Sequence, residues 1–172
     1  AHPGLVGEVR AAGHEVALHG LDHRALTALD PKSVERRLRD NKSELEDVAG
    51  TEVRWLRPPY GSQSPATWRA TRRAGLMPVM WSAGLGDSRP IDDAARLAGL
   101  RSRLRAGVII LAHDNFADAS DGAADGDLPA VDRYALSQRM LAMLDDAGLA
   151  GCSLARALET GAARRRAWFG RR

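Results

Sequence analysis

Cysteine and long apolar runs are both scarce in this chain of 172 residues. Cys152 is the only cysteine, which excludes an internal disulfide framework. No apolar stretch approaches the roughly 18 residues that a membrane-spanning helix needs. Hydrophobic residues make up 44% of the chain and charged residues 27%. This composition is typical of one globular domain that is large enough to bury a core.

The chain also lacks a broad basic surface, although its formal net charge is +3. Five arginines gather close to the C-terminus, namely Arg164, Arg165, Arg166, Arg171 and Arg172. Without them the remaining chain would be slightly negative, so the composition does not indicate a nucleic-acid-binding protein. We expect residues 161–172 to form a solvated basic tail, with contact to an anionic surface or wall polymer as the alternative.

Apolar runs alternate with amphipathic stretches along residues 1–160, which indicates an α/β fold with a parallel sheet. Asp30-Pro31 and Ser64-Pro65 are typical helix starts. The segment GVIILAH, residues 107–113, is apolar almost throughout, as a strand buried on both faces should be. The predicted helices are 3–12, 31–48, 65–75, 90–104, 131–147 and a last one ending at 160. The predicted strands are 14–18, 53–56, 76–81, 107–113 and 149–154.

Polar residues suited to chemistry follow four of these strands. His19 follows the first, Arg57 to Gly61 the second, Asp87 the third, and His113 ends the fourth. Ligands bind beyond the carboxyl ends of parallel strands. We therefore expect these residues to meet at one edge of the sheet.

His19 and His23 stand four residues apart and would share a face if the backbone turns helically between them. Imidazole is the commonest protein ligand for zinc-like ions, and a catalytic zinc site normally has three protein ligands. By spacing alone, two histidines are also compatible with no metal role. The candidates for a third ligand are Asp22, Asp87, His113 and Asp114, and spacing does not choose among them.

Two further segments favour a catalytic site. In RPPYG, residues 57–61, prolines stiffen the exit from a strand and Arg57 is placed to hold a carboxylate. In ILAHDN, residues 110–115, His113 lies at the end of a buried strand, where it suits acid–base work. Leu111 shares a strand face with His113 and could line a small apolar pocket.

The acidic stretch Asp114–Pro129 is the one long loop that the pattern predicts. Its spacing does not fit a calcium-binding loop, and no glutamate stands at the closing position. We expect a solvated flap.

Taken in order, four segments resemble the NodB-homology polysaccharide deacetylases, carbohydrate esterase family 4. They are AAGHEVALHGLDH (11–23), RPPYG (57–61), VMWSAGLGD (79–87) and VIILAHD (108–114), and LDDAGLAGCSLARAL resembles the closing strand and helix. The resemblance covers residues 1 to about 160. It implies a distorted (β/α) barrel and a hydrolase that removes acetyl groups with the help of a divalent metal, for which zinc is the expected ion.

The resemblance also implies roles for individual residues. His19 and His23 match the two histidine ligands, and His113 matches the general acid. Arg57 matches the arginine that orients the catalytic base, and Asp87 matches an acidic residue that pairs with that arginine. The backbone N–H of residue 60, a tyrosine, matches the oxyanion donor, and residue 111, a leucine, matches the lining of the acetyl-methyl pocket.

This sequence departs from the family pattern at two places. The family's first motif, an Asp-Asp pair that supplies a metal ligand and the base, is absent, so we expect a fragment that lacks the first strands and has little activity. Ser88 replaces a tryptophan, and Gly84 occupies an earlier aspartate position. The implied partner is an N- or O-acetylated carbohydrate, and the implied location is the cell envelope or outside, with the cytoplasm still open. A hydrolase for a small non-sugar amide and a non-catalytic remnant are the alternatives.

Overall fold

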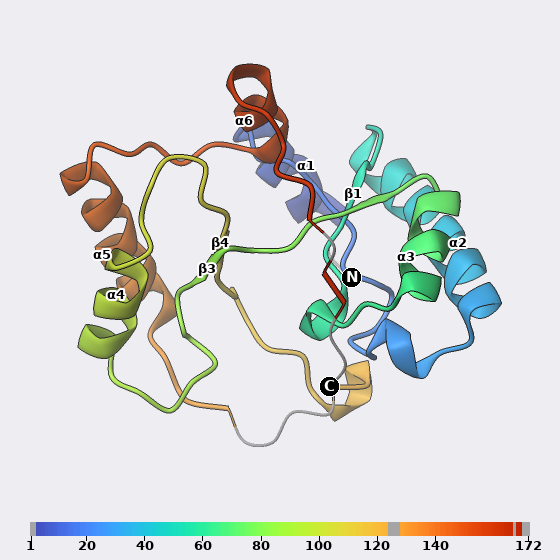
Figure 1. Ribbon diagram of the computed structural model, residues 1–172, viewed down its shortest axis with the longest axis horizontal. Coiled ribbons are helices and arrows are strands. Elements are labelled where there is room, and N and C mark those ends of the chain that lie inside the picture. The colour runs from blue at the N-terminus through green and yellow to red at the C-terminus, as the bar shows by residue number, and fades with distance from the viewer. Residues whose placement is uncertain (1–2, 124–127, 167, 170–172) are drawn as a thin grey trace.

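The computed structural model describes residues 3–123, 128–166 and 168–169 (Figure 1). Its helices are α1 (Pro3–Ala11), α2 (Pro31–Ala49), α3 (Pro65–Arg73), α4 (Asp93–Arg101), α5 (Arg133–Asp146) and α6 (Leu154–Thr160). Three short 3₁₀ turns are η1 (Leu26–Ala28), η2 (Pro59–Gly61) and η3 (Ala119–Asp121). The strands are β1 (Trp55–Leu56), β2 (Met77–Pro78), β3 (Ala83–Gly84) and β4 (Ile110–Leu111).

The predicted helix starts are confirmed, because local side chains cap them. Asp30 accepts a hydrogen bond from the Ser33 backbone at 3.0 Å at the start of α2, directly before Pro31. Ser64 caps α3 in a reciprocal capping box with Thr67. Such caps satisfy backbone N–H groups that have no partner within the helix.

The strands are much shorter than predicted and all pair in parallel. Trp55 lies opposite Met77 in the β1–β2 pair, and Ala83 lies opposite Ile110 in the β3–β4 pair. The predicted first strand, 14–18, is reduced to a single parallel bridge between Leu18 and Leu56. The order is therefore Leu18, β1, β2 in one group and β3, β4 in the other.

Two of the predicted strand assignments were wrong. Residues 149–153 pair with no strand among the described residues, and the segment leads directly into α6. Ala83–Gly84, which the sequence placed in a loop, forms β3. A strand exists only where a neighbouring strand supplies hydrogen bonds. For β3 this neighbour is β4, which begins 26 residues after β3 ends, so the local sequence does not predict the pairing.

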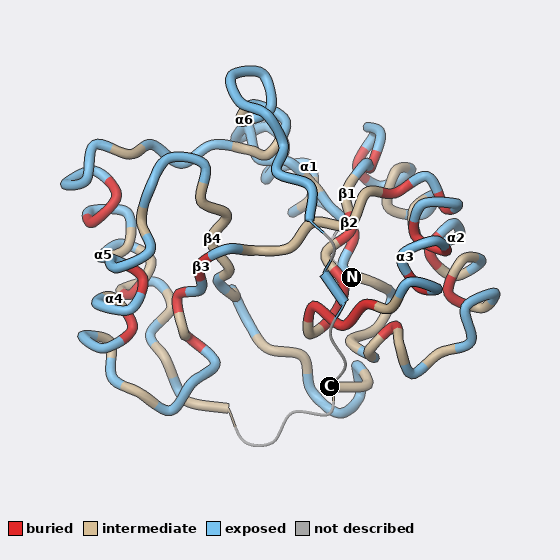
Figure 2. Tube along the Cα trace, viewed as in Figure 1, coloured by how far each residue is buried: buried red, intermediate tan, exposed pale blue. Residues whose placement is uncertain are grey.

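Two apolar clusters build the core, and each belongs to one half of the molecule (Figures 1 and 2). Leu38, Leu56 and Leu76 lie in the cluster beneath α2 and α3. Leu100 and Leu136 lie in the cluster between α4, α5 and the β3–β4 pair. Residues 79–82 connect β2 in one half to β3 in the other.

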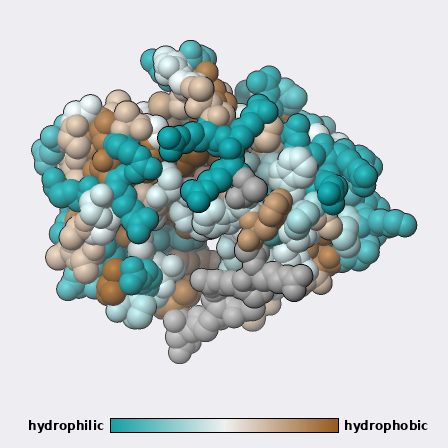
Figure 3. Space-filling view, viewed as in Figure 1, coloured by the Kyte–Doolittle hydropathy of each residue, from teal (hydrophilic) through white to brown (hydrophobic). Residues whose placement is uncertain are grey.

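The architecture is α/β, as predicted, and it is incomplete, since the described strands form two separate pairs rather than a closed barrel. No helix of the described residues is long and apolar enough to cross a bilayer. On the face drawn in Figure 3, hydrophilic side chains cover most of the periphery, and apolar side chains emerge in small separate patches.

Candidate metal and acid–base site

His19 and His23 lie together, as their spacing predicted. Their ring centroids are 5.2 Å apart. His19 directly follows Leu18, which bridges to β1, so the strand end fixes its backbone. The turn that follows carries His23 back beside His19.

The two imidazoles suit a divalent metal in different degrees. The His19 Nδ1 atom lies 2.6 Å from the Arg57 carbonyl oxygen. A carbonyl only accepts, so Nδ1 carries the hydrogen and Nε2 keeps a lone pair, as in histidine metal ligands. The His23 Nδ1 atom is buried and has no hydrogen-bond partner among the described residues. These two residues would hold the metal, although they do not make a full set of three ligands.

Burial lowers the pKa of His19, and this effect exceeds the opposing hydrogen bond to the Arg57 carbonyl. The nearby charges of His23, Arg57 and His113 lower the pKa further. The imidazole therefore stays neutral to a lower pH than an ordinary histidine, and neutral imidazole is the form that binds metal.

Arg57 follows β1, and its carbonyl oxygen contacts the His19 ring. Its guanidinium carbon is 5.9 Å from the centre of the Trp81 ring. Its Nε atom is buried without a hydrogen-bond partner among the described residues, and burial lowers the pKa of its guanidinium. No carboxylate of the described residues forms an ion pair with Arg57. The carboxylate base that Arg57 is predicted to orient is therefore not found among these residues.

The turn η2 brings Tyr60 onto His23. The two ring centroids are 4.5 Å apart in an edge-to-face arrangement. Tyr60 adopts a left-handed backbone with φ of 58°, which is uncommon for a residue with a side chain. Such conformations cluster at functional sites, where the surrounding structure enforces them. The structure thus places the Tyr60 backbone in an unusual conformation directly beside the two histidines.

His113 and Asp87 form a hydrogen-bonded pair in the other half of the molecule. The His113 Nδ1 atom lies 3.1 Å from both carboxylate oxygens of Asp87, and the His113 backbone N–H donates to Asp87 Oδ2 at 2.7 Å. An ionised carboxylate only accepts, so Nδ1 carries the hydrogen and Nε2 is the nitrogen left for proton exchange. Leu111 precedes His113 by two residues, in β4 opposite Gly84.

Asp87 is almost fully buried, with 2% of its surface exposed. Burial alone would raise the pKa of its carboxyl group, but the hydrogen bonds and charge of His113 outweigh burial and lower that pKa below its usual value. Asp87 is therefore an ionised partner that orients the His113 ring.

The predicted pairing of Asp87 with Arg57 was wrong. Asp87 follows β3, and His113 follows β4, the strand that pairs with β3. Carboxyl ends of adjacent parallel strands meet, so these two residues are neighbours. Arg57 follows β1 in the other pair of strands.

The loop after β4 connects the two halves of the site. The His23 backbone N–H donates to the carbonyl of Asp121, in the segment that follows His113. The site therefore combines a pair of metal-type ligands, a half-buried arginine and a carboxylate–histidine pair, which follow Leu18, β1, β3 and β4.

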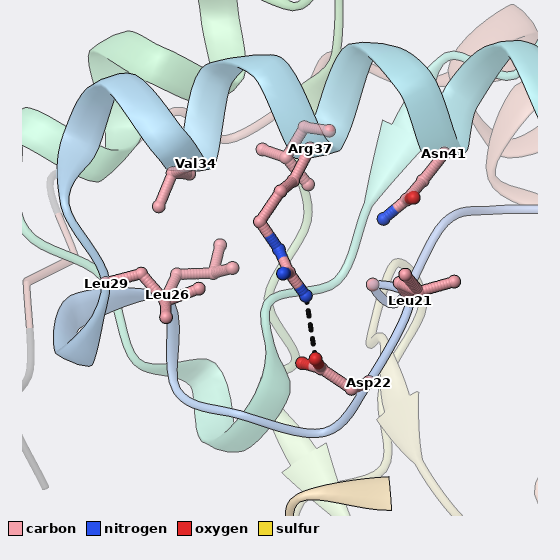
Figure 4. Close-up of a pocket in the computed structure, with 9 residues that line it drawn as sticks. Leu21, Asp22, Leu26, Leu29, Val34, Arg37 and Asn41 are labelled. Carbon is pink, nitrogen blue, oxygen red and sulfur yellow. Dashed lines mark hydrogen bonds and ion pairs between the residues drawn. The ribbon is translucent and has the colours of Figure 1, made fainter.

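The candidate third metal ligands do not lie beside the two histidines. Among the described residues, no group of three His, Cys, Asp or Glu side chains could hold a metal ion. Asp22 turns away to Arg37 on α2 and to Arg24, each at 2.7 Å, beside an apolar pocket that includes Leu26 and Val34 (Figure 4). Asp114 is exposed and accepts only from the Asn115 backbone among the described contacts.

Two residues that support the site, Arg96 and Phe116, were not predicted from the sequence. Arg96 on α4 is buried and donates to the Gly86 and Arg89 carbonyls at 3.1 and 2.7 Å, which fixes the loop that carries Asp87. Phe116 lies against His113, with ring centroids 5.5 Å apart. The only signals in the sequence were an arginine in a helix made mostly of Ala, Leu and Gly, and one aromatic residue in an acidic loop.

The described first half of the predicted flap is solvated at 114–115 and 118–121, as expected, but it also contacts the site. The His23 backbone N–H donates to the Asp121 carbonyl at 2.7 Å, so η3 packs against the histidine segment. Residues 124–127 of that loop lie outside the described residues. In the basic tail, residues 161–166 are exposed as expected, but the Trp168 carbonyl accepts from the buried side chain of Gln63 at 2.9 Å. Arg171 and Arg172 lie outside the described residues.

Comparisons with known proteins find similar sequences and folds. The family model for polysaccharide deacetylases matches residues 1–79, which include both histidines and the RPPYG turn. A chitooligosaccharide deacetylase of Sinorhizobium fredii is 40% identical over 114 residues, 65% of this chain and 53% of that protein. The chain thus spans about half the length of this relative.

Solved structures share the fold as well. A family 4 carbohydrate esterase from Streptomyces lividans, in complex with acetate, aligns with a TM-score of 0.70 and 25% identity over 88% of this chain and 70% of that one. A family 4 pseudoenzyme from Bacillus anthracis aligns with a TM-score of 0.72 and 17% identity over 91% of this chain and 50% of that one. By sequence and by fold, the chain is thus similar to the polysaccharide deacetylases of carbohydrate esterase family 4.

Proposed function

We propose that this chain is the part of a metal-dependent carbohydrate deacetylase that carries two metal ligands, the oxyanion donor and the acid. The observation that carries the proposal is that the His19–His23 pair and the Asp87–His113 pair both follow strands and are linked through the hydrogen bond from the His23 backbone to the Asp121 carbonyl. The substrate would be an N-acetylated oligosaccharide or polysaccharide. Similarity to chitooligosaccharide deacetylases supports this class of substrate.

The reaction adds water across the acetamide C–N bond. The water oxygen bonds to the carbonyl carbon, the C–N bond breaks, acetate leaves, and the amine nitrogen takes a proton. Protonated at Nε2, His113 would give that proton, because Asp87 accepts from the opposite ring nitrogen, and the proton that water loses on attack would restore it. His19 and His23 would hold a divalent ion such as zinc, which imidazole ligands suit, and the ion would polarise the acetyl carbonyl and lower the pKa of water.

The remaining residues would bind and orient the substrate. The Tyr60 backbone N–H would face the developing oxyanion, a role that its enforced left-handed conformation supports. Leu111 would contact the acetyl methyl group. Arg57 would orient a carboxylate base, which the described residues do not provide beside it.

The test is metal binding and acetate release by the 172-residue chain. With two ligands in place, we expect weak Zn²⁺ binding that His19→Ala and His23→Ala both abolish, measured by calorimetry. We expect release of acetate from N-acetylated chitooligosaccharides to be slow or undetectable. Zn²⁺ binding that survives both substitutions would contradict the assignment of ligands.

A larger protein that supplies the carboxylate beside Arg57 should be active. There we expect chelation to remove activity and His113→Ala to slow it by about 10²–10⁴-fold. Unchanged activity after either treatment would contradict the mechanism. Robust metal-dependent release by the 172-residue chain itself would contradict the expectation of low activity.

A non-catalytic domain is the second candidate. Two observations favour it: Arg57 has no carboxylate partner, and no third ligand joins the histidines among the described residues. Oligosaccharide binding without acetate release, both in this chain and in any larger protein that contains it, would support this candidate.

A further inference from the structure

The segment from His113 to Gly122 connects the acid side of the site to the metal side. At its start, Phe116 packs on His113, and the Arg133 guanidinium carbon lies 4.4 Å above the Phe116 ring. At its end, the Asp121 carbonyl accepts from the His23 backbone N–H at 2.7 Å. The segment is therefore attached at both ends to residues of the site.

The two histidines are fixed in different ways. His19 has its ring held by the hydrogen bond between Nδ1 and the Arg57 carbonyl. His23 has no such bond on Nδ1 among the described residues. Metal-binding histidines normally rely on a hydrogen bond at the second ring nitrogen for their orientation. In His23 the orientation depends on the contact with the Tyr60 ring and on the position of its backbone.

The Asp118 side chain shapes the turn that anchors this backbone. Its Oδ1 atom accepts from the Ser120 backbone at 2.7 Å, from the Ser120 hydroxyl at 2.5 Å and from the Asp121 backbone at 3.3 Å. These bonds close η3 and set the direction in which the Asp121 carbonyl points. Asp118 itself is exposed and does not contact the site.

A second contact fits the same turn to the histidine segment. Gly122 has φ of 76°, and a Cβ atom there would lie 2.7 Å from Cγ of Arg24. Arg24 is held in place by Asp22, which accepts from its guanidinium at 2.7 and 3.0 Å. The side chain of residue 24 and the backbone of residue 23 therefore both meet η3.

We propose that Asp118 is a positioning residue for His23, because its carboxylate shapes the turn whose Asp121 carbonyl holds the His23 backbone. The proposal rests on the proposed function only in treating His23 as a metal ligand. In this proposal the exposed acidic loop, which follows His113, fixes the position of the metal-binding histidine His23.

The test measures the hydrogen exchange of the His23 amide by NMR in the metal-free 172-residue chain. Asp118→Ala should accelerate this exchange by about tenfold or more, because the amide loses a firmly held acceptor. Asp118→Asn keeps an oxygen acceptor and should restore protection to within about twofold of the original chain.

Asp132→Ala is the matched control. Asp132 caps α5 in the same manner, accepting from the Ala135 backbone at 2.9 Å, but does not contact the histidine segment. It should leave His23 exchange unchanged while costing similar stability. The proposal is overturned if Asp118→Ala leaves His23 exchange unchanged, or if Asp132→Ala accelerates it as much.

A second measurement uses Co²⁺ as the probe. Asp118→Ala should weaken Co²⁺ binding by about tenfold, and Asp118→Asn by less than about twofold. Equal affinity of the original chain and Asp118→Ala would overturn the proposal. If no form of the chain binds Co²⁺, the proposed function fails, whereas the amide exchange of His23 still decides the role of Asp118.

Discussion

At the residue scale, the turn after β1 shows how backbone conformation and packing select particular residues. Tyr60 and Gly61 both have left-handed backbones, with φ of 58° and 63°. A Cβ atom on Gly61 would lie 2.8 Å from the Trp81 ring, so the indole occupies the space of a side chain there. Glycine at position 61 is therefore required twice, by φ and by Trp81.

We expect Gly61→Ala to lower the free energy of unfolding by about 2–4 kcal/mol, from left-handed strain and the collision with Trp81. Gly13→Ala separates the two causes, since Gly13 has φ of 85° but nothing within 4 Å of a new Cβ atom. It should cost about 1–2 kcal/mol. Urea unfolding measures both, and equal losses would show that Trp81 does not restrict position 61.

Asp87 gives a prediction for acid stability. Its carboxyl pKa is lowered in the folded protein, because the hydrogen bonds from His113 outweigh burial. The stabilisation is complete above the unfolded pKa of about 3.9 and is lost as pH falls through the lower folded value. Asp87→Asn should therefore be less stable at pH 7 and should show a shallower loss of stability below about pH 4. Unfolding at a series of pH values tests this, and parallel curves for both proteins would contradict it.

Much of the candidate site could be predicted at this scale, because its residues follow strands. His19, Arg57 and His113 lie at the carboxyl ends of strands or bridges, as the sequence predicted. The partner of Asp87 could not be predicted, since it depends on which strands are adjacent, and the sequence does not record adjacency. Asp118 and Arg96 were missed for a related reason, because they act through backbone carbonyls, and any residue type can supply a carbonyl.

At the element scale, helices followed the sequence closely and strands did not. Each of α2 to α6 begins at an Asp or Ser whose side chain accepts from the first turn. This signal is local and can be read directly. The strands are only two residues long, so their existence depends on a partner rather than on their own composition.

The capping box of α3 can be tested by Ser64→Ala. This change removes an acceptor for the Thr67 backbone and should lower the free energy of unfolding by about 1 kcal/mol. Ser43→Ala, on the exposed side of α2, is the matched control and should be neutral or slightly stabilising, by up to about 0.5 kcal/mol. Thermal unfolding compares them, and an equal response of both variants would argue against the cap.

At the scale of the whole molecule, each half of the chain supplies one half of the site. The cluster that includes Leu38 supports the histidine pair and Arg57. The cluster that includes Leu100 supports the Asp87–His113 pair. The two clusters share no buried residue, so the geometry between ligands and acid depends on connecting segments such as 79–82 and 112–118 and on the contacts of η3.

Leu100→Ala tests this division. Leu100 is fully buried, and its truncation should cost about 2–5 kcal/mol. We expect amides of α4 and α5 to exchange much faster, while those of α2 and α3 remain protected. Leu38→Ala should give the reverse pattern. Hydrogen exchange followed by mass spectrometry measures both, and uniform acceleration across the chain would indicate one cooperative core.

The contact between the His23 N–H and the Asp121 carbonyl also has a kinetic consequence. It joins two segments about 100 residues apart, so closing it carries the entropy cost of a long loop. The helices can form early from their local caps, but His23 reaches its final position only after the chain has been made and folded beyond η3. In nascent or partly folded chains His23 is therefore held loosely. The two histidines can bind a metal together only when folding is complete.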